Sequence, residues 1–185
     1  MKKLVVILIT VMPVLIVGCA TQVQQTGSFA PPATSVKPGD VIFGSITADQ
    51  TVASSSDYAS SMDDLRSALS DRLQQVLPGR TLIFNNPPAG VSAGLKMEIT
   101  VLDFNHVSGA GRFFAGIAAG HARLEVHVVL TDIQTGNKFG DAEFGTKSSN
   151  WEGIFGGTTS RQIDAVAGRI IGMIAGKTDA ASSQP

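Results

Sequence analysis

Two stretches of the chain alternate apolar and polar side chains with a period of two residues, and this pattern constrains the fold more than any other feature. The apolar members are Leu95, Met97, Ile99 and Val101 in the first stretch and Leu124, Val126, Val128 and Leu130 in the second. Such alternation is typical of a half-buried strand, which turns one face to a core and the other to water. The chain must therefore build a sheet with one apolar and one polar face.

Further strands and two amphipathic helices are expected around these stretches. Strands are expected at 41–47, 81–84, 95–107, 121–131 and 138–146, with a hairpin turn at 132–137 between the last two. Apolar residues recur every three or four positions in two helical segments, at Met62, Leu65, Leu69, Leu73 and Val76, and at Ile163, Val166, Ile170, Met173 and Ile174. This order predicts an α+β fold, an antiparallel-rich sheet of about five strands with two helices packed on one face.

Residues 1–18 have the build of a cleaved export signal. Lys2 and Lys3 precede an apolar run of 14 residues at 4–17. A helix that spans a bilayer needs about 20 apolar residues, so the run is too short for a retained anchor.

The export signal ends at Gly18, and Cys19 follows directly. A cysteine at this position resembles the lipobox of bacterial lipoproteins. The resemblance implies that Cys19 becomes the mature N-terminus and carries acyl chains that bind a membrane. An aspartate directly after the cysteine would resemble an inner-membrane retention signal, but Ala20 stands there. The resemblance therefore also implies an anchor in the outer membrane, facing the periplasm. The alternative is an ordinary secretory signal with a chance cysteine.

The mature chain divides into three parts by composition. Residues 19–39 are rich in Gln, Thr, Ser and Pro, which predicts a lipidated N-terminus followed by a flexible tether with a reach of roughly 25 Å. Residues 40–176 are expected to form a single α+β periplasmic domain. Residues 177–185 are small and polar, which predicts a disordered tail.

Glycines recur every four residues in the last predicted helix, at Gly168, Gly172 and Gly176, so they lie along one side of it. Because glycine in a helix costs about 1 kcal/mol relative to alanine, such a row suggests that another backbone approaches closely. The helix could pack tightly on its own sheet, or the row could be an oligomer face or a membrane-contact face.

A glycine-spaced apolar segment at 109–120 contains Phe113, Phe114 and Ile117. These three side chains could form an exposed tip that contacts a membrane or a protein partner, or they could fold back over the sheet.

The segment from Arg112 to Gly120, the strand that follows it and the turn Asp132-x-x-Thr135-Gly136 resemble the bacterial lipoprotein family called domain of unknown function 4410 (DUF4410). The likeness extends roughly over residues 40–176. It implies a fold type and an envelope location, and it implies no activity.

Charge and composition exclude several classes of function. Removal of residues 1–18 leaves 12 basic and 15 acidic residues, a net charge of −3, which argues against nucleic-acid binding. One cysteine allows neither an intrachain disulfide nor a cysteine-based zinc site. His121 and His127 lie about 20 Å apart on a continuous strand, too far to share a metal ion. We therefore expect no cofactor, no metal-binding residues and no catalytic residues.

The sequence supports a non-enzymatic lipoprotein that binds a protein partner or assists assembly in the bacterial envelope. The alternative is a structural homo-oligomer built through its glycine-rich faces. A third hypothesis is an enzyme that acts on envelope glycan or lipid, which would need a cleft with convergent carboxylates or a perturbed histidine.

Overall fold

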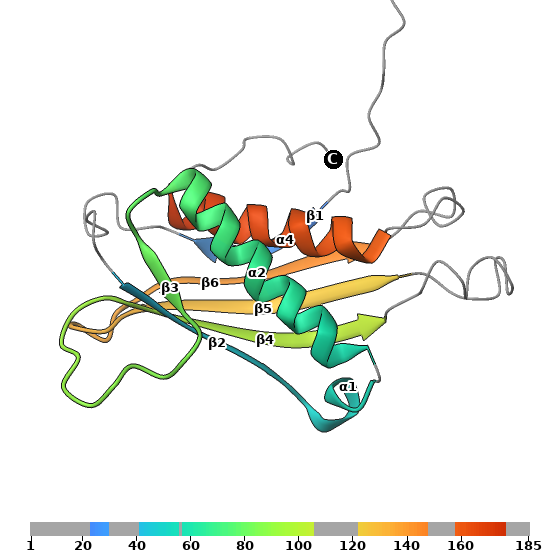
Figure 1. Cartoon of the computed structure of the whole chain (residues 1–185), viewed down its shortest axis with the longest axis horizontal. Coiled ribbons are helices and arrows are strands. Elements are labelled where there is room, and N and C mark those ends of the chain that lie inside the picture. Colours follow the sequence, from blue (N-terminus) through green and yellow to red (C-terminus); the bar gives the residue numbers. More distant parts are fainter. Residues whose placement is uncertain (1–22, 30–40, 56, 106–121, 148–157, 177–185) are drawn as a thin grey trace, which may run out of the picture.

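The computed structural model describes residues 23–29, 41–55, 57–105, 122–147 and 158–176, which form a six-stranded sheet with helices on one face (Figure 1). The strands are β1 (Val23–Phe29), β2 (Val41–Ala48), β3 (Thr81–Ile83), β4 (Leu95–Asn105), β5 (Arg123–Asp132) and β6 (Lys138–Lys147). The helices are α1 (Gln50–Ala53), α2 (Tyr58–Val76) and α4 (Thr158–Ile174). The α+β class expected from the sequence is confirmed.

The sheet is mixed, with the strand order β1-β6-β5-β4-β2-β3. The pairs β1–β6, β6–β5 and β5–β4 are antiparallel, whereas β2 is parallel to both β3 and β4. The expectation of about five strands and two helices is therefore only roughly right. Because α2 connects β2 to β3 as a helical crossover, these two strands run in the same direction, and β4 then pairs with the opposite side of β2.

The two alternating stretches become the paired central strands β4 and β5. Their register places Ile99 opposite Val128 and Val101 opposite Val126, and all four side chains are buried. Phe144 of β6 lies opposite Val126 on the other side and is also fully buried. Three neighbouring strands thus contribute to one apolar face.

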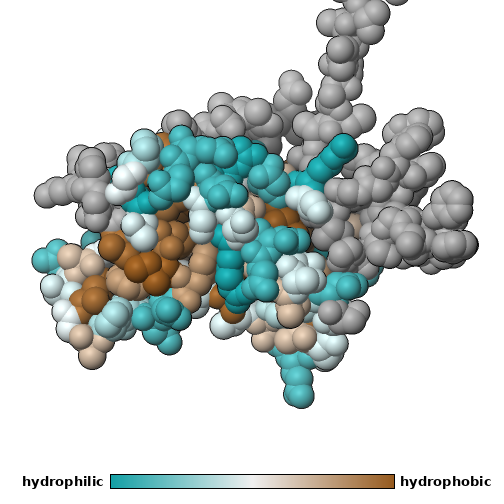
Figure 2. All heavy atoms as spheres, in the orientation of Figure 1, coloured by the Kyte–Doolittle hydropathy of each residue, from teal (hydrophilic) through white to brown (hydrophobic). Residues whose placement is uncertain are grey.

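The helices α2 and α4 cover this apolar face (Figure 1). The predicted core positions Met62, Leu65, Leu69 and Leu73 of α2 are buried, as are Ile163, Val166, Ile170, Met173 and Ile174 of α4. Val76, the last predicted position of α2, is half-buried against the core. The two helical periodicities are therefore confirmed, and each helix buries its apolar side against the sheet. Figure 2 shows mainly hydrophilic residues over the outer side of the helices and a hydrophobic area beside β3, where Ile83 is 37% exposed.

Residues 23–29 differ from the sequence-based expectation, which placed them in a flexible tether. They form β1, which pairs with β6 from Val23 opposite Thr146 to Phe29 opposite Gly140. Val23 is buried, whereas Gln24, Gln25 and Thr26 are exposed. Backbone hydrogen bonds pair this strand with β6, and three polar residues at 24–26 follow Val23, so the sequence carries no alternating pattern there.

The hairpin between β5 and β6 is confirmed, and its turn chemistry is visible. The Asp132 carboxylate accepts hydrogen bonds from the backbone N–H groups of Gln134 at 2.7 Å and Thr135 at 3.0 Å. Gly136 has φ +69°, a left-handed conformation that glycine adopts without a steric cost. The turn places the start of β6 beside the end of β5.

Two valines on β5 provide a test of which sheet face forms the core. Val126 is fully buried under the helices, and Val129 is half-buried on the opposite face. We predict that Val126→Ala lowers the free energy of unfolding by about 2–3 kcal/mol, because it removes buried methyl groups and leaves a cavity. Val129→Ala should lower the free energy of unfolding by under about 1 kcal/mol. It is a matched control, because both variants lose the same strand propensity. Equal losses in urea denaturation would contradict the assignment of the core face.

Candidate functional site

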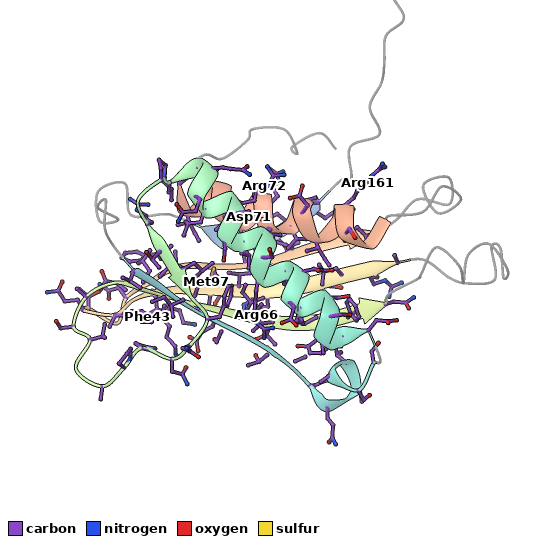
Figure 3. The ribbon with its side chains drawn as sticks, in the orientation of Figure 1. Phe43, Arg66, Asp71, Arg72, Met97 and Arg161 are labelled. Atoms are coloured by element: carbon purple, nitrogen blue, oxygen red, sulfur yellow. The ribbon has the colours of Figure 1, made fainter. Side chains whose placement is uncertain are left out.

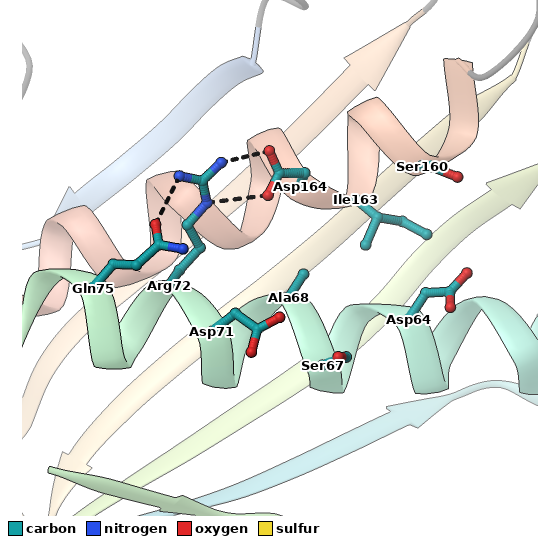
Figure 4. Close-up of a pocket in the computed structure, with 9 residues that line it drawn as sticks. All are labelled: Asp64, Ser67, Ala68, Asp71, Arg72, Gln75, Ser160, Ile163 and Asp164. Carbon is teal, nitrogen blue, oxygen red and sulfur yellow. Dashed lines mark hydrogen bonds and ion pairs between the residues drawn. The ribbon is translucent and has the colours of Figure 1, made fainter.

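A polar groove lies on the outer surface of the two long helices, with a volume of about 400 Å³. It is lined by Asp64, Ser67, Ala68, Asp71, Arg72 and Gln75 of α2 and by Ser160, Ile163 and Asp164 of α4 (Figure 4). The amphipathic pattern of the helices explains its position, because the side chains that face away from the sheet meet where the helices lie side by side.

Arg72 links the two helices across this groove. Its Nε donates to Asp164 Oδ1 at 3.0 Å and its Nη2 donates to Asp164 Oδ2 at 2.5 Å, which is a bidentate pair. Its Nη1 donates to Gln75 Oε1 at 3.2 Å. The hydrogen bonds that Arg72 donates to Asp164 raise the pKa of Arg72 above its ordinary value, and they fix the guanidinium in place.

The groove carries more negative than positive charge. Asp164 neutralises Arg72, whereas Asp64 and Asp71 are exposed and make no ion pair with another described residue. Figure 3 shows Asp71 and Arg72 on the same stretch of α2. This arrangement can accept hydrogen bonds from a ligand and attract a cation by its charge.

The uncovered face of the sheet carries a second set of charged residues. Arg123, Glu125 and His127 of β5 share this face with Asp141 and Glu143 of β6, as the two-residue period requires. A shallow depression of about 190 Å³ lies here, lined by Gln24, Thr26, Arg123, Glu125, Glu143, Gly145 and Thr146. Gly145 stands opposite Glu125 on one side and opposite Gln24 on the other, so the missing side chain leaves the hollow.

Ion pairs hold most of these side chains in place. Arg123 Nη1 lies 2.7 Å from Asp103 Oδ2, and His127 Nε2 lies 2.5 Å from Asp141 Oδ1. The hydrogen bond from His127 is the main reason that the pKa of Asp141 lies below its ordinary value. His127 is therefore engaged with a carboxylate rather than directed at a second histidine.

The glycines of α4 are placed differently from one another. At Gly168 an added Cβ would have Arg72 Nε, at 4.0 Å, as its nearest described neighbour, so no described backbone approaches closely there. Gly172 is half-buried. Gly176 follows the end of α4 with φ +71° and donates its N–H to the carbonyl of Met173 at 2.9 Å, which is a helix-ending conformation.

The other predicted site residues, Cys19, Phe113, Phe114 and Ile117, lie outside the described residues, as does His121. Sequence reasoning did not single out Arg72 or Asp164. These two are 92 positions apart, and each falls on the polar side of an ordinary amphipathic helix. Their pairing becomes visible only once the helices are packed together.

Within the described ranges, no group of three or more His, Cys, Asp or Glu side chains is arranged to hold a metal ion. None of the helices described has the length and apolar character needed to cross a bilayer.

The described residues thus define an α+β domain with a mixed sheet, one helix-covered face and one charged face. The chain belongs to the family described as a domain of unknown function (DUF4410), whose model matches residues 28–149, about two thirds of the chain. This confirms the family expected from the sequence. No curated protein matches the chain.

Solved structures share the fold at low sequence identity. The PelC dodecamer from Paraburkholderia phytofirmans aligns with a TM-score of 0.53 and 14% identity, covering 83% of this chain and 96% of that chain. A point variant of the same dodecamer aligns with a TM-score of 0.54 and 15% identity over the same shares. At this identity the likeness shows the fold alone.

The His127–Asp141 contact predicts a specific pKa change. Because the folded-state pKa of Asp141 lies below the ordinary value of 3.8, the contact stabilises the fold above that pH, and this stabilisation is lost as pH falls through the lowered pKa. His127→Ala should raise the pKa of Asp141 toward 3.8 in an NMR titration of the carboxyl carbon. Lys138 is a smaller cause, so Lys138→Ala should raise it less. A larger rise in the Lys138 variant would contradict this ranking.

Proposed function

We propose that this protein is a bacterial lipoprotein that acyl chains on Cys19 anchor to the outer membrane, with its domain in the periplasm. The observation that carries the proposal is the leader, in which two lysines and a 14-residue apolar run end at Gly18-Cys19. Several acyl chains at about 0.8 kcal/mol per buried methylene hold a domain firmly on a membrane.

We further propose that the domain is a non-enzymatic module that binds a protein partner or assists assembly in the envelope. The groove between α2 and α4 supports recognition, because it presents exposed carboxylates beside a fixed guanidinium. A partner segment with lysine or arginine side chains and free N–H groups would complement these charges.

A structural homo-oligomer is the second candidate, and two observations favour it. The PelC structures that share this fold are dodecamers. In addition, Gly168 lies inside α4, where glycine costs about 1 kcal/mol relative to alanine, although no backbone of another described element lies within 4 Å of an added Cβ. A close contact with a second copy would account for this glycine.

The anchoring proposal is tested by replacing the acylated residue. Cys19→Ser cannot form the thioether, so we expect the variant to leave the membrane fraction for the soluble fraction on cell fractionation. Wild-type protein should stay in the membrane fraction after a high-salt wash, because salt screens charges and does not weaken acyl insertion. A Cys19→Ser variant that stays fully membrane-bound would overturn the proposal.

The oligomer candidate is tested at Gly168. Gly168→Leu should abolish an assembly detected by light scattering, because the larger side chain separates the two backbones. The methyl group of Gly168→Ala fits within its own chain. This variant should raise the free energy of unfolding of the monomer by up to about 1 kcal/mol. A wild-type protein that stays monomeric at high concentration would rule this candidate out, and so would a Leu variant that assembles normally.

A further inference from the structure

The strand β1 begins only four residues after Cys19. Val23 lies opposite Thr146, and Thr146 lies opposite Leu124, so the start of β1 is at the end of the sheet where β6 finishes and β5 starts. We call this the Val23 end of the sheet. The opposite end holds the turn between β5 and β6, about 30 Å away at roughly 3.3 Å per residue along β5.

Covalent length limits how far Cys19 can lie from this end. Four residues of fully extended chain span at most about 14 Å, whatever their conformation. If β1 were unpaired, the first strand after Cys19 would be β2, which begins at Val41. Those 22 residues would have a mean reach of about 26 Å and would allow the domain to turn freely. The pairing of β1 therefore decides whether Cys19 is attached by a short or a long connection.

The segment between β1 and β2 is long enough for β1 to pair with β6 of the same chain. The end of β1 and the start of β2 lie at the same end of the sheet, because Phe29 pairs with Gly140 and Ile42 pairs with Leu95. Four strand spacings of about 4.8 Å separate β1 from β2, which is roughly 19 Å. Residues 30–40 can span up to about 36–40 Å, so β1 can reach β6 of its own chain.

Gly27 is the residue on which this pairing depends most. Its φ is +94°, and an added Cβ would lie 2.5 Å from the carbonyl oxygen of Asp141 on β6. Any other residue would have to move the two backbones apart. By contrast, Gly90 has a similar φ of +93° with no described atom within 4 Å of an added Cβ, which makes it a matched control far from β1.

We propose that β1 fixes the orientation of the domain on a phospholipid surface, with the Val23 end facing the bilayer and the β5–β6 turn pointing away. The inference rests on the proposed lipidation of Cys19. Gln24, Gln25 and Thr26 of the edge strand β1 are exposed. This favours an end-on over an edge-on arrangement, since burying these polar side chains against lipid costs free energy.

A neighbouring feature fits the same orientation. Arg161 is exposed on the first turn of α4 (Figure 3), and the adjacent Gln162 donates to the carbonyl of Ala122 at 3.2 Å, which places this turn near the Val23 end. An exposed arginine there can reach lipid phosphates.

The experiment measures distances from two ends of the domain to a membrane. The full lipidated protein is reconstituted in phospholipid vesicles that carry an acceptor dye on their headgroups. Cys19 is the single native cysteine, so Asn105→Cys and Gln134→Cys each add one labelling position, at the Val23 end and at the β5–β6 turn. We expect energy transfer to place the Asn105 probe about 30 Å closer to the headgroups than the Gln134 probe.

Two further variants test the cause of this difference. Gly27→Ala should abolish it by unpairing β1, whereas Gly90→Ala should preserve it. A 20-residue Gly/Ser insertion after Gln22 should also abolish it while β1 stays paired. Equal distances for the two probes in anchored wild-type protein would overturn the inference, as would a difference that survives the insertion. Loss of anchoring itself would instead count against the lipidation of Cys19.

Discussion

The pairing of β4 with β5 is the interaction on which the rest of the structure depends. Its register brings Ile99 beside Val128 and Val101 beside Val126, so two local alternations become one apolar surface. The helices α2 and α4 bury their own apolar sides on this surface, at about 25 cal/mol for each Å² removed from water. Neighbouring residues of a strand point to opposite sides of the sheet, so the polar residues between these apolar ones lie on the face that the helices do not cover.

This pairing also carries the N-terminal strand. Because β5 turns back into β6 through a tight hairpin, β6 presents an edge, and β1 adds to that edge through backbone hydrogen bonds. The strand contributes Val23 to the core. Its importance lies in position, because it connects the Val23 end of the sheet to the residue proposed to carry lipid. The same set of strands thus supports both the core and the proposed attachment to the membrane.

Local periodicity explains which parts of the fold are visible in the sequence. The strands β4 and β5 and the helices α2 and α4 each repeat apolar residues with the period of their own secondary structure, so their existence follows from short windows. The turn at Asp132 and Gly136 is likewise encoded by residues close together in the sequence.

By contrast, β1 depends on β6, about 117 positions away, and on one glycine conformation. The parallel pairs of β2 and the Arg72–Asp164 contact also arise only from tertiary packing. Of the candidate sites, the leader and Cys19 are readable as a linear motif, whereas the groove between the helices is not.

The most direct test of lipid anchoring through Cys19 is mass spectrometry of the N-terminal peptide of the protein purified from its native envelope. We expect a mature chain that begins at Cys19, with a diacylglyceryl thioether on its sulfur and an acyl group on its amine. A chain that begins elsewhere, or an unmodified thiol at Cys19, would contradict it.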